Sequence, residues 1–233
     1  MGNKKIDTNE DIFKDLGQTV SRSEKFVESN KKVISISLIS AVLIFLLYVG
    51  YTNYYKSPRE IEAINDMDQA KVYFSEGNFD LALDGDGQFS GFNDIIEKYS
   101  STSAANLSRY YAGMIYLKKS EYEKSINLLQ DYYSKDIFSM AIAKGGIGDA
   151  FSQLKQYDKA LTSYREAVSI SDNDITAPTF LMKGAIVALE LKKYSVATEM
   201  FTTIKDKFPK SAEAKDVEKY IELSKYSALA NKD

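Results

Sequence analysis

The 233-residue sequence contains no cysteine, no histidine and no tryptophan, and it has only three prolines. Without cysteine the chain has no disulfide, no thiolate ligand for a metal and no thiol nucleophile. Without histidine it lacks the commonest metal ligand and the usual general base near neutral pH. Three prolines and twelve glycines also argue against a loop-rich β protein.

The chain also carries little net charge. The formal net charge is −3, so no basic excess is available to neutralise phosphates, and nucleic acid is not expected as a partner. Carboxylates are numerous but follow the spacing of solvated helix faces, and no glycine-rich phosphate loop follows a strand pattern. An enzyme would have to work with Asp, Glu, Ser, Lys or Tyr alone. We therefore predict a non-enzymatic protein with no catalytic residues and no cofactor.

One stretch invites a metal interpretation. The sequence DGDGQFSGF, Asp84 to Phe92, holds two aspartates and three glycines in nine residues. An EF-hand needs a glutamate at its twelfth position, but the twelfth residue counted from Asp84 is Ile95. The glycines favour a turn-rich loop that bends a helix before Asn93–Tyr99 resumes it. No metal site is predicted.

An apolar run, VISISLISAVLIFLLYVGY, occupies Val33 to Tyr51 and contains no charge over nineteen residues. At about 1.5 Å per residue, a helix of this length nearly spans the ~30 Å hydrocarbon core of a bilayer. Tyrosines gather at its far end, as at a membrane interface. The run is therefore predicted to be a transmembrane helix in contact with the lipid bilayer. Its anchoring side chains are predicted to be Val33, Leu38, Leu43, Phe45, Leu47 and Tyr51.

Two other interpretations of this run are less favoured. It could be a fully buried helix of a soluble protein, but nineteen uncharged residues exceed what such helices usually need. It could be a cleaved signal peptide, but a mostly polar segment of 32 residues precedes it and no A-x-A site follows it. The absence of cysteine excludes lipid attachment at a lipoprotein site.

The polar segment 1–32 carries seven Lys/Arg and six Asp/Glu. A weak amphipathic pattern of Ile12, Leu16 and Val20 leaves two interpretations open, a short helix or a disordered tail. The sixteen residues before the apolar run hold four basic side chains and the sixteen after it hold two. By the positive-inside rule, the tail lies in the cytoplasm and the rest of the chain lies across the membrane.

The chain is thus divided into four parts. These are a cytoplasmic tail (1–32), a transmembrane helix (33–51), a juxtamembrane linker (52–63) and a helical repeat domain (64–233). Pro58 is expected to break the chain just beyond the membrane.

The repeat is clearest in the sequence GDAFSQLKQYDKALTSYREA, Gly148 to Ala167. It predicts a first helix, a turn at 154–156 and a second helix that begins at Tyr157. Ala160, Tyr164 and Ala167 then follow at helical spacing on one face. Gly148 and Ala160 are expected where the two helices approach closely. A single hairpin cannot bury its apolar face, so similar units should stack beside it.

Three further copies are recognisable. One spans Gly184–Pro209, one spans Ala112–Tyr132, and a less regular one starts near Ile64. The aromatic residues that open the second helices are Phe79, Tyr122, Tyr157 and Tyr194. Their intervals of 43, 35 and 37 fit a basic unit of about 34 residues with loop insertions. A last helix, Ser211 to Leu229, is predicted to cap the stack with a polar outer face. The predicted fold class is all-α.

These repeats resemble the tetratricopeptide repeat, a helix-turn-helix unit, over roughly Ile64 to Leu229. The sequence departs from that pattern in its long insertion, in Ser125 where alanine is usual, and in the absence of proline after the middle repeats. The whole layout resembles the YfgM-like family, which are ancillary subunits of the bacterial SecYEG translocon. The stretch ALDGDGQFSGF, followed by NLSRYYAG, is similar to the form of such proteins in Bacteroidetes-type bacteria.

That resemblance implies a single-pass protein of the bacterial inner membrane, with its repeat domain in the periplasm. Its implied partners are the SecYEG translocon and a membrane-anchored periplasmic prolyl isomerase that acts as a chaperone. An alternative is a scaffold of another envelope assembly, in outer-membrane biogenesis, secretion or motility.

A stack of such hairpins leaves a concave groove lined by the first helices. The third repeat should contribute small and polar residues there, among them Gly145, Asp149, Ser152 and Gln153. No arginine clamp for a peptide carboxylate is present. The alternative is that the predicted groove residues pack against a neighbouring repeat or the last helix. The apolar residues predicted to bind protein in the groove are Tyr110, Met114, Leu117, Met182, Ile186 and Leu189.

Overall fold

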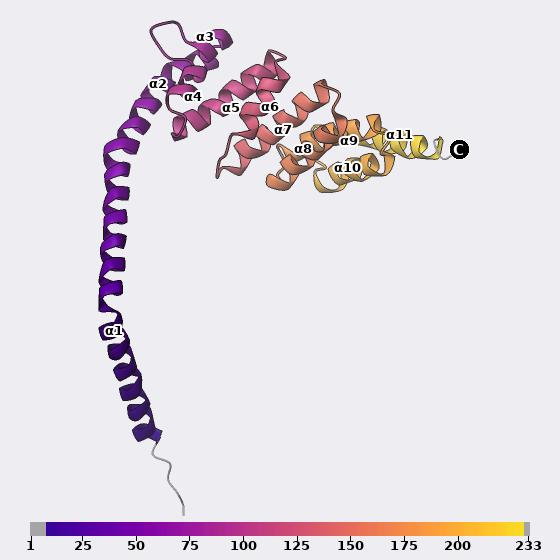
Figure 1. Ribbon diagram of the computed structural model, residues 1–233. Coiled ribbons are helices and arrows are strands. Elements are labelled where there is room, and N and C mark those ends of the chain that lie inside the picture. The colour runs from indigo at the N-terminus through magenta and orange to yellow at the C-terminus, as the bar shows by residue number, and fades with distance from the viewer. Residues whose placement is uncertain (1–7, 231–233) are drawn as a thin grey trace, which may run out of the picture. The chain divides into compact units, whose positions relative to one another are not determined.

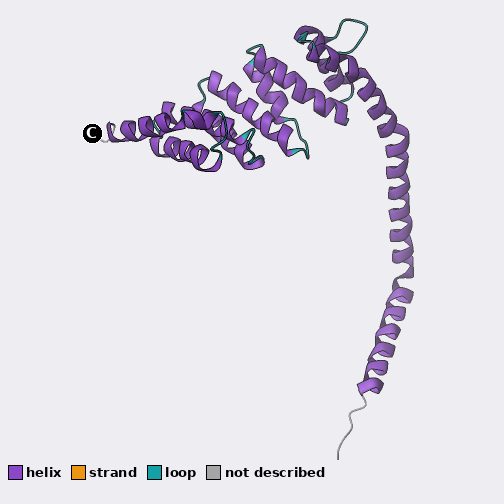
Figure 2. Cartoon of the chain, turned by 180° about the vertical axis from the view of Figure 1, so that it is seen from behind, coloured by secondary structure: helices purple, strands orange, loops and turns teal. Residues whose placement is uncertain are grey.

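The structure, a computed structural model, describes the backbone of residues 8–230 and the side chains of residues 26–230. Over this range the chain consists of helices and loops, without a strand (Figure 2), which confirms the all-α fold class. The chain divides into two compact units after Pro58. The elements are α1 (Thr8–Tyr51), the π-helical turn η1 (Thr52–Lys56), α2 (Ser57–Ser75), α3 (Phe79–Asp84), α4 (Phe92–Lys98), α5 (Ser103–Lys118), α6 (Tyr122–Gln130), α7 (Ile137–Gln153), α8 (Tyr157–Ile170), α9 (Ala177–Glu190), α10 (Tyr194–Lys207), the 3₁₀ turn η2 (Glu213–Lys215) and α11 (Val217–Ala230).

The first unit is dominated by α1 (Figure 1). The helical run that begins at Phe26 contains an 18-residue window with a mean hydropathy of 2.6, and none of that window is buried. By length and composition, this helix is able to cross a membrane. The buried-helix interpretation does not fit, because apolar side chains such as Leu38 and Leu47 are exposed.

Of the two interpretations of the tail, helix or disorder, the described backbone shows helix from Thr8 onward. Residues 1–7 lie outside the described part of the chain. The side chains of Ile12, Leu16 and Val20 also lie outside it, so the amphipathic pattern there stays a prediction.

The two compact units divide directly after Pro58, where a break was predicted, but the helix itself continues through the proline. The segment predicted as a linker, 52–63, is helical. A proline has no N–H to donate, and its ring clashes with the carbonyl four residues earlier in an α-helix. Here a π-helical turn stands directly before it, and the Ser57 N–H donates to the Thr52 carbonyl, five residues back. This wider turn accommodates the proline without ending the helix.

The second unit begins at Arg59, five residues before the boundary predicted at 64. Ala63 is fully buried, and the Glu60 carboxylate accepts hydrogen bonds from the N–H groups of Ser103 (3.0 Å) and Ala104 (3.3 Å) at the start of α5. A carboxylate at a helix N-terminus satisfies backbone donors that have no partner inside the helix. The amino-terminal part of α2 is therefore part of the repeat unit.

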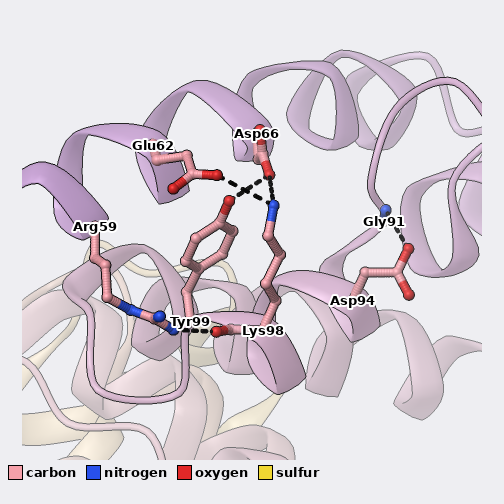
Figure 3. A network of polar contacts seen from close by, with 7 residues as sticks. All are labelled: Arg59, Glu62, Asp66, Gly91, Asp94, Lys98 and Tyr99. Carbon is pink, nitrogen blue, oxygen red and sulfur yellow. Dashed lines mark hydrogen bonds and ion pairs between the residues drawn. The ribbon is translucent and has the colours of Figure 1, made fainter.

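A polar network ties α2 to α4 (Figure 3). The Lys98 ammonium lies 3.3 Å from a carboxylate oxygen of Glu62 and 3.3 Å from one of Asp66. The Tyr99 hydroxyl donates to Asp66 at 2.7 Å, and Arg59 donates to the Lys98 carbonyl. Burial raises the pKa of Tyr99 to about 12, so its hydroxyl remains a donor.

From α2 onward the helices form antiparallel hairpins that follow one another to α11 (Figure 1). Each second helix begins at the predicted aromatic residue, since α3, α6, α8 and α10 start at Phe79, Tyr122, Tyr157 and Tyr194. The prediction of four hairpins is therefore confirmed.

The four hairpin turns share one geometry. The residue two positions before each second helix has a positive φ: 79° at Gly77, 63° at Ser120, 57° at Lys155 and 57° at Lys192. The next residue donates its N–H to the carbonyl five residues earlier, at 2.8–2.9 Å. This is the Schellman arrangement that ends many helices. Only the first turn uses glycine, the residue that adopts a positive φ without strain.

The insertion separates α3 from α4, as predicted, and its aspartates are engaged by protein donors. Asp86 accepts hydrogen bonds from the Tyr73 hydroxyl (2.7 Å) and from two backbone N–H groups of its own loop. The Tyr73 hydrogen bond, followed by those backbone bonds, lowers the pKa of Asp86. Asp84 accepts from the Asn93 amide at 2.8 Å. These bonds give both carboxylates a structural part in the loop.

Small residues let neighbouring helices of the repeat unit approach each other closely. Gly148 lies against the ring of Tyr164, where a Cβ would be 2.7 Å from the ring carbons, and Ala160 is fully buried. This confirms the predicted close approach of α7 and α8. At the other end, Phe92 and Tyr111 stack with ring centroids 5.2 Å apart.

The last helix, α11, buries Val217 and Ile221 against α10. Its outer face was predicted to be polar, but Leu223, Tyr226 and Leu229 are exposed there among lysines and glutamates. The 3.6-residue period places these three residues opposite the buried ones. The helix therefore covers the core with one face and presents apolar area to solvent with the other.

Ser125 gives a prediction about stability. It occupies the fully buried position that Ala82, Ala160 and Ala197 hold in the other hairpins, and no described atom lies within hydrogen-bonding distance of its hydroxyl. Ser125→Ala is expected to raise the free energy of unfolding by about 1 kcal/mol, because it removes an unsatisfied buried donor and improves helix propensity. Urea unfolding followed by circular dichroism measures this.

The control for Ser125→Ala is Ser163→Ala on α8. The Ser163 hydroxyl is also largely buried, but it donates to the Lys159 carbonyl at 3.0 Å. Its removal should bring no comparable gain. Equal gains from both substitutions would contradict the explanation.

Candidate protein-binding groove

A hollow of about 470 Å³ lies where α5, α7 and α9 come together. Most of its lining residues belong to α5, α7 and α9, which are the first helices of their hairpins. In a solenoid of helical hairpins, first helices line the concave surface. Its walls are formed by Leu117, Tyr122, Asp149, Ser152, Gln153, Tyr164, Lys183, Ile186 and Val187.

A charged pair crosses this hollow. The Lys183 ammonium on α9 lies 2.8 Å from both carboxylate oxygens of Asp149 on α7. The Tyr164 hydroxyl on α8 donates to the Oδ1 atom of Asp149, also at 2.8 Å. The side chains of Asp149 and Lys183 are 29% and 40% exposed, so the pair remains accessible to a ligand.

Tyr164 holds Asp149 in place. Its ring is buried, and burial, followed by the negative charge of Asp149, raises the pKa of Tyr164 well above its usual value. The phenol therefore keeps its proton at physiological pH and remains a donor. The Asp149 carboxylate thus has two fixed partners, one buried and one accessible.

Three apolar side chains form another part of the wall. Ile186 is 42% exposed and Leu117 is half-buried, whereas Val187 is buried behind them. A hollow with apolar walls and a few fixed polar groups can hold an aliphatic side chain and hydrogen-bond the backbone that carries it. The arrangement is suited to binding a polypeptide.

The six apolar residues predicted for the groove are divided by the structure. Leu117 and Ile186 line the hollow together. Met182 and Leu189 are partly buried against the core of α7–α11. Tyr110 belongs with Met114 to the cluster that joins α5, α6 and α7. Met182, Leu189, Tyr110 and Met114 therefore fit the alternative interpretation, in which the residues pack against neighbouring repeats. That any of the six residues binds protein stays a prediction.

The ring of Tyr110 explains its placement. Its centroid lies 5.1 Å from that of Tyr132 and 5.6 Å from that of Tyr111. Burial raises the pKa of the Tyr110 phenol. Tyr110 therefore packs between an aromatic side chain of its own helix and one that follows α6 in the same hairpin.

The third hairpin contributes as predicted, with one exception. Asp149, Ser152 and Gln153 line the hollow, but Gly145 lies beneath the ring of Phe180. A glycine was predicted for the surface because its repeat position faces the groove. The neighbouring helix approaches so closely there that no side chain fits.

Lys183 was missed by the repeat pattern, which placed Met182 in the groove instead. The sequence does contain one signal for a special role of this residue: Lys183 is the only charged residue between Ala177 and Leu189. A single charge inside an apolar helix requires a partner or an exit to water. Nothing in the sequence marks Tyr122 or Tyr164 as wall residues, since both also fit the core pattern of the second helices.

A second hollow of about 470 Å³ lies on α6, α7 and α8, over the Ile147 and Phe151 side chains. An ion pair between Lys144 and Glu166 (2.9 Å) crosses it, and the Lys159 ammonium lies 5.2 Å from the centroid of the Phe151 ring. These long charged side chains cover apolar surface by their own stems.

Comparison with known proteins supports the repeat assignment. A family described as "Tetratricopeptide repeat" matches residues 143–174, which cover the second half of α7, all of α8 and the start of the next connection. A search of curated proteins found no match. The matched segment contains Asp149 and Tyr164, and the hairpins on both sides repeat its turn geometry. Residues 59–230 therefore have the fold of a tetratricopeptide repeat solenoid, a fold that typically binds other proteins.

Proposed function

We propose that this protein is a membrane-anchored, non-enzymatic protein-interaction module whose groove binds a polypeptide segment of its partner. The observation that carries this proposal is the hollow between α5, α7 and α9, which is accessible and combines apolar walls with a fixed charged pair. Solenoids of helical hairpins use concave surfaces of this kind for binding.

The anchor is the second part of the proposal. The apolar segment 33–51 would cross the bilayer, because its side chains are exposed around the helix and its hydropathy suits hydrocarbon. The greater number of basic residues before the segment supports a cytoplasmic N-terminus and a periplasmic repeat domain.

The resemblance to YfgM-like proteins supports a specific complex for this protein. In that case it would be an accessory subunit of the SecYEG translocon and would coordinate a membrane-anchored prolyl isomerase with emerging chains. The second candidate, a scaffold of another envelope assembly, has the same anchor and groove. Only the bound partner distinguishes the two.

Affinity purification of the full chain in mild detergent tests both. Recovery of SecY, SecE or SecG with a periplasmic chaperone would support the translocon assignment. Recovery of a different envelope complex without the Sec channel would favour the alternative.

The groove itself is tested by Ile186→Glu in the same purification. The substitution places a carboxylate on the apolar wall and should reduce the recovered partner about tenfold or more. Ile186 is 42% exposed, so the fold should tolerate the change. The control is Ile175→Glu in the connection between α8 and α9, where the side chain is exposed outside the hollow. Equal recovery with Ile186→Glu and the wild type would exclude this hollow as the binding site.

A further inference from the structure

We propose that the hollow selects an uncharged, internal segment of its partner and rejects a free carboxylate, because Asp149 neutralises the lysine that would otherwise attract one. This inference deepens the proposed function and depends on it. It assigns a specificity role to three residues, Asp149, Lys183 and Tyr164.

The first step concerns charge. Lys183 is the positive side chain in the wall of the hollow, and Asp149 is the negative one. Both carboxylate oxygens lie 2.8 Å from the ammonium, so the two formal charges cancel within the wall. A carboxylate that approached Lys183 would also approach Asp149 closely, and repulsion between the carboxylates would offset the attraction.

The second step concerns the hydrogen bonds that remain. An ammonium has three protons, and the contacts to Asp149 use two of them. The Oδ1 atom of Asp149 accepts from both Tyr164 and Lys183, whereas Oδ2 accepts from Lys183. The pair therefore offers one donor and one acceptor side by side. A peptide group, with a carbonyl and a nearby N–H, complements this arrangement without carrying a charge.

The third step concerns side chains. Leu117 and Ile186 stand beside the pair and present apolar surface to the hollow. An aliphatic side chain of the ligand would be covered there while its backbone meets Asp149 and Lys183. The fitting ligand is an apolar stretch within a chain rather than a chain terminus or an acidic motif.

Tyr164 is a positioning residue in this arrangement. Its buried ring packs against Gly148 on the same helix as Asp149, and its hydroxyl donates to the carboxylate. Asp149 is thereby held toward Lys183 instead of rotating into water. The neutralisation is therefore built into the wall of the hollow.

The test measures binding of two fluorescent peptides by the full chain in detergent. Both have the same leucine-rich, uncharged sequence, but one is blocked at both ends and the other ends in a free carboxylate. The wild type should bind the blocked peptide about tenfold more tightly. In Asp149→Asn the unneutralised Lys183 should remove that preference or reverse it.

Two further variants make the result decisive. Asp158→Asn removes a carboxylate that pairs with Lys193 at 2.6 Å outside the hollow, and it should leave the preference unchanged. Lys183→Met leaves Asp149 unneutralised and should strengthen the preference for the blocked peptide. Opposite shifts from Asp149→Asn and Lys183→Met are not produced by a loss of folding, and circular dichroism checks that both variants fold.

The outcomes separate the inference from the function on which it rests. Equal or tighter binding of the carboxylate peptide by the wild type, or an unchanged ratio in Asp149→Asn, would overturn the specificity role while leaving peptide binding established. Failure of every variant and of the wild type to bind either peptide would overturn both.

Discussion

Replacing Leu43 and Phe45 together by lysine is expected to release the protein from the membrane fraction. Both side chains lie near the middle of the apolar segment and are exposed around α1. A lysine at the centre of a membrane helix costs about 2.5–3.5 kcal/mol on insertion scales, so two cost about 6 kcal/mol and disfavour insertion by roughly 10⁴-fold. Alkaline extraction of membranes, followed by detection of the chain in each fraction, measures the change.

The control for this pair is Tyr54→Lys with Tyr55→Lys, just beyond the apolar segment in η1. Lysines at the end of a membrane helix extend their ammonium groups to the aqueous interface, so this variant should stay with the membrane. If the central variant also stays membrane-bound, the segment is not the anchor. Protease added to intact spheroplasts should digest the wild-type repeat unit, and protection of that unit would show the opposite orientation.

Gly145→Ala is expected to destabilise the repeat unit strongly. A Cβ at this position would overlap the ring of Phe180, which is itself nearly buried between the third and fourth hairpins. The better helix propensity of alanine contributes about 1 kcal/mol, but displacement of a packed ring costs more. We expect a net loss of about 2 kcal/mol and a fall in the melting temperature of about 4–8 °C.

The neighbouring glycine provides the matched control. A Cβ at Gly146 would lie 3.1 Å from a terminal methyl of Leu129, which can shift by a few tenths of an ångström. Gly146→Ala should therefore stay within about 1 kcal/mol of the wild type or be slightly more stable. If the two substitutions have equal effects, close packing on Phe180 is not the cause. Adding Phe180→Leu to Gly145→Ala should recover part of the loss, since it removes the overlapping ring atoms.

The sequence predicted the repeats well because their signals are local. An aromatic residue opens each second helix, and the small residue at Ala160 and its equivalents follows three positions later. Both are consequences of helical period within one hairpin. The two units divide directly after Pro58, but the helix continues through it, because the effect of a proline depends on whether the preceding turn is α or π. The presence of a proline does not by itself show which hydrogen-bond pattern the preceding turn adopts.

The candidate site was less predictable because it depends on contacts between hairpins. Leu117 and Ile186 were predicted for the groove and line it, but Asp149 and Lys183 are 34 residues apart and meet only through the stacking of α7 on α9. A pattern read one repeat at a time does not show that these charges neutralise each other. For the same reason, the sequence pattern did not show that the Phe180 ring packs directly on Gly145.

The four equivalent hairpin turns also bear on how the chain folds. Each turn brings two neighbouring helices together through contacts that are close in sequence, and each hairpin then packs on the next one. Domains rich in such local contacts fold quickly, and repeat arrays can extend from any hairpin already formed. A repeat unit that follows its apolar helix in the chain can therefore assemble stepwise from α2 toward α11 during synthesis.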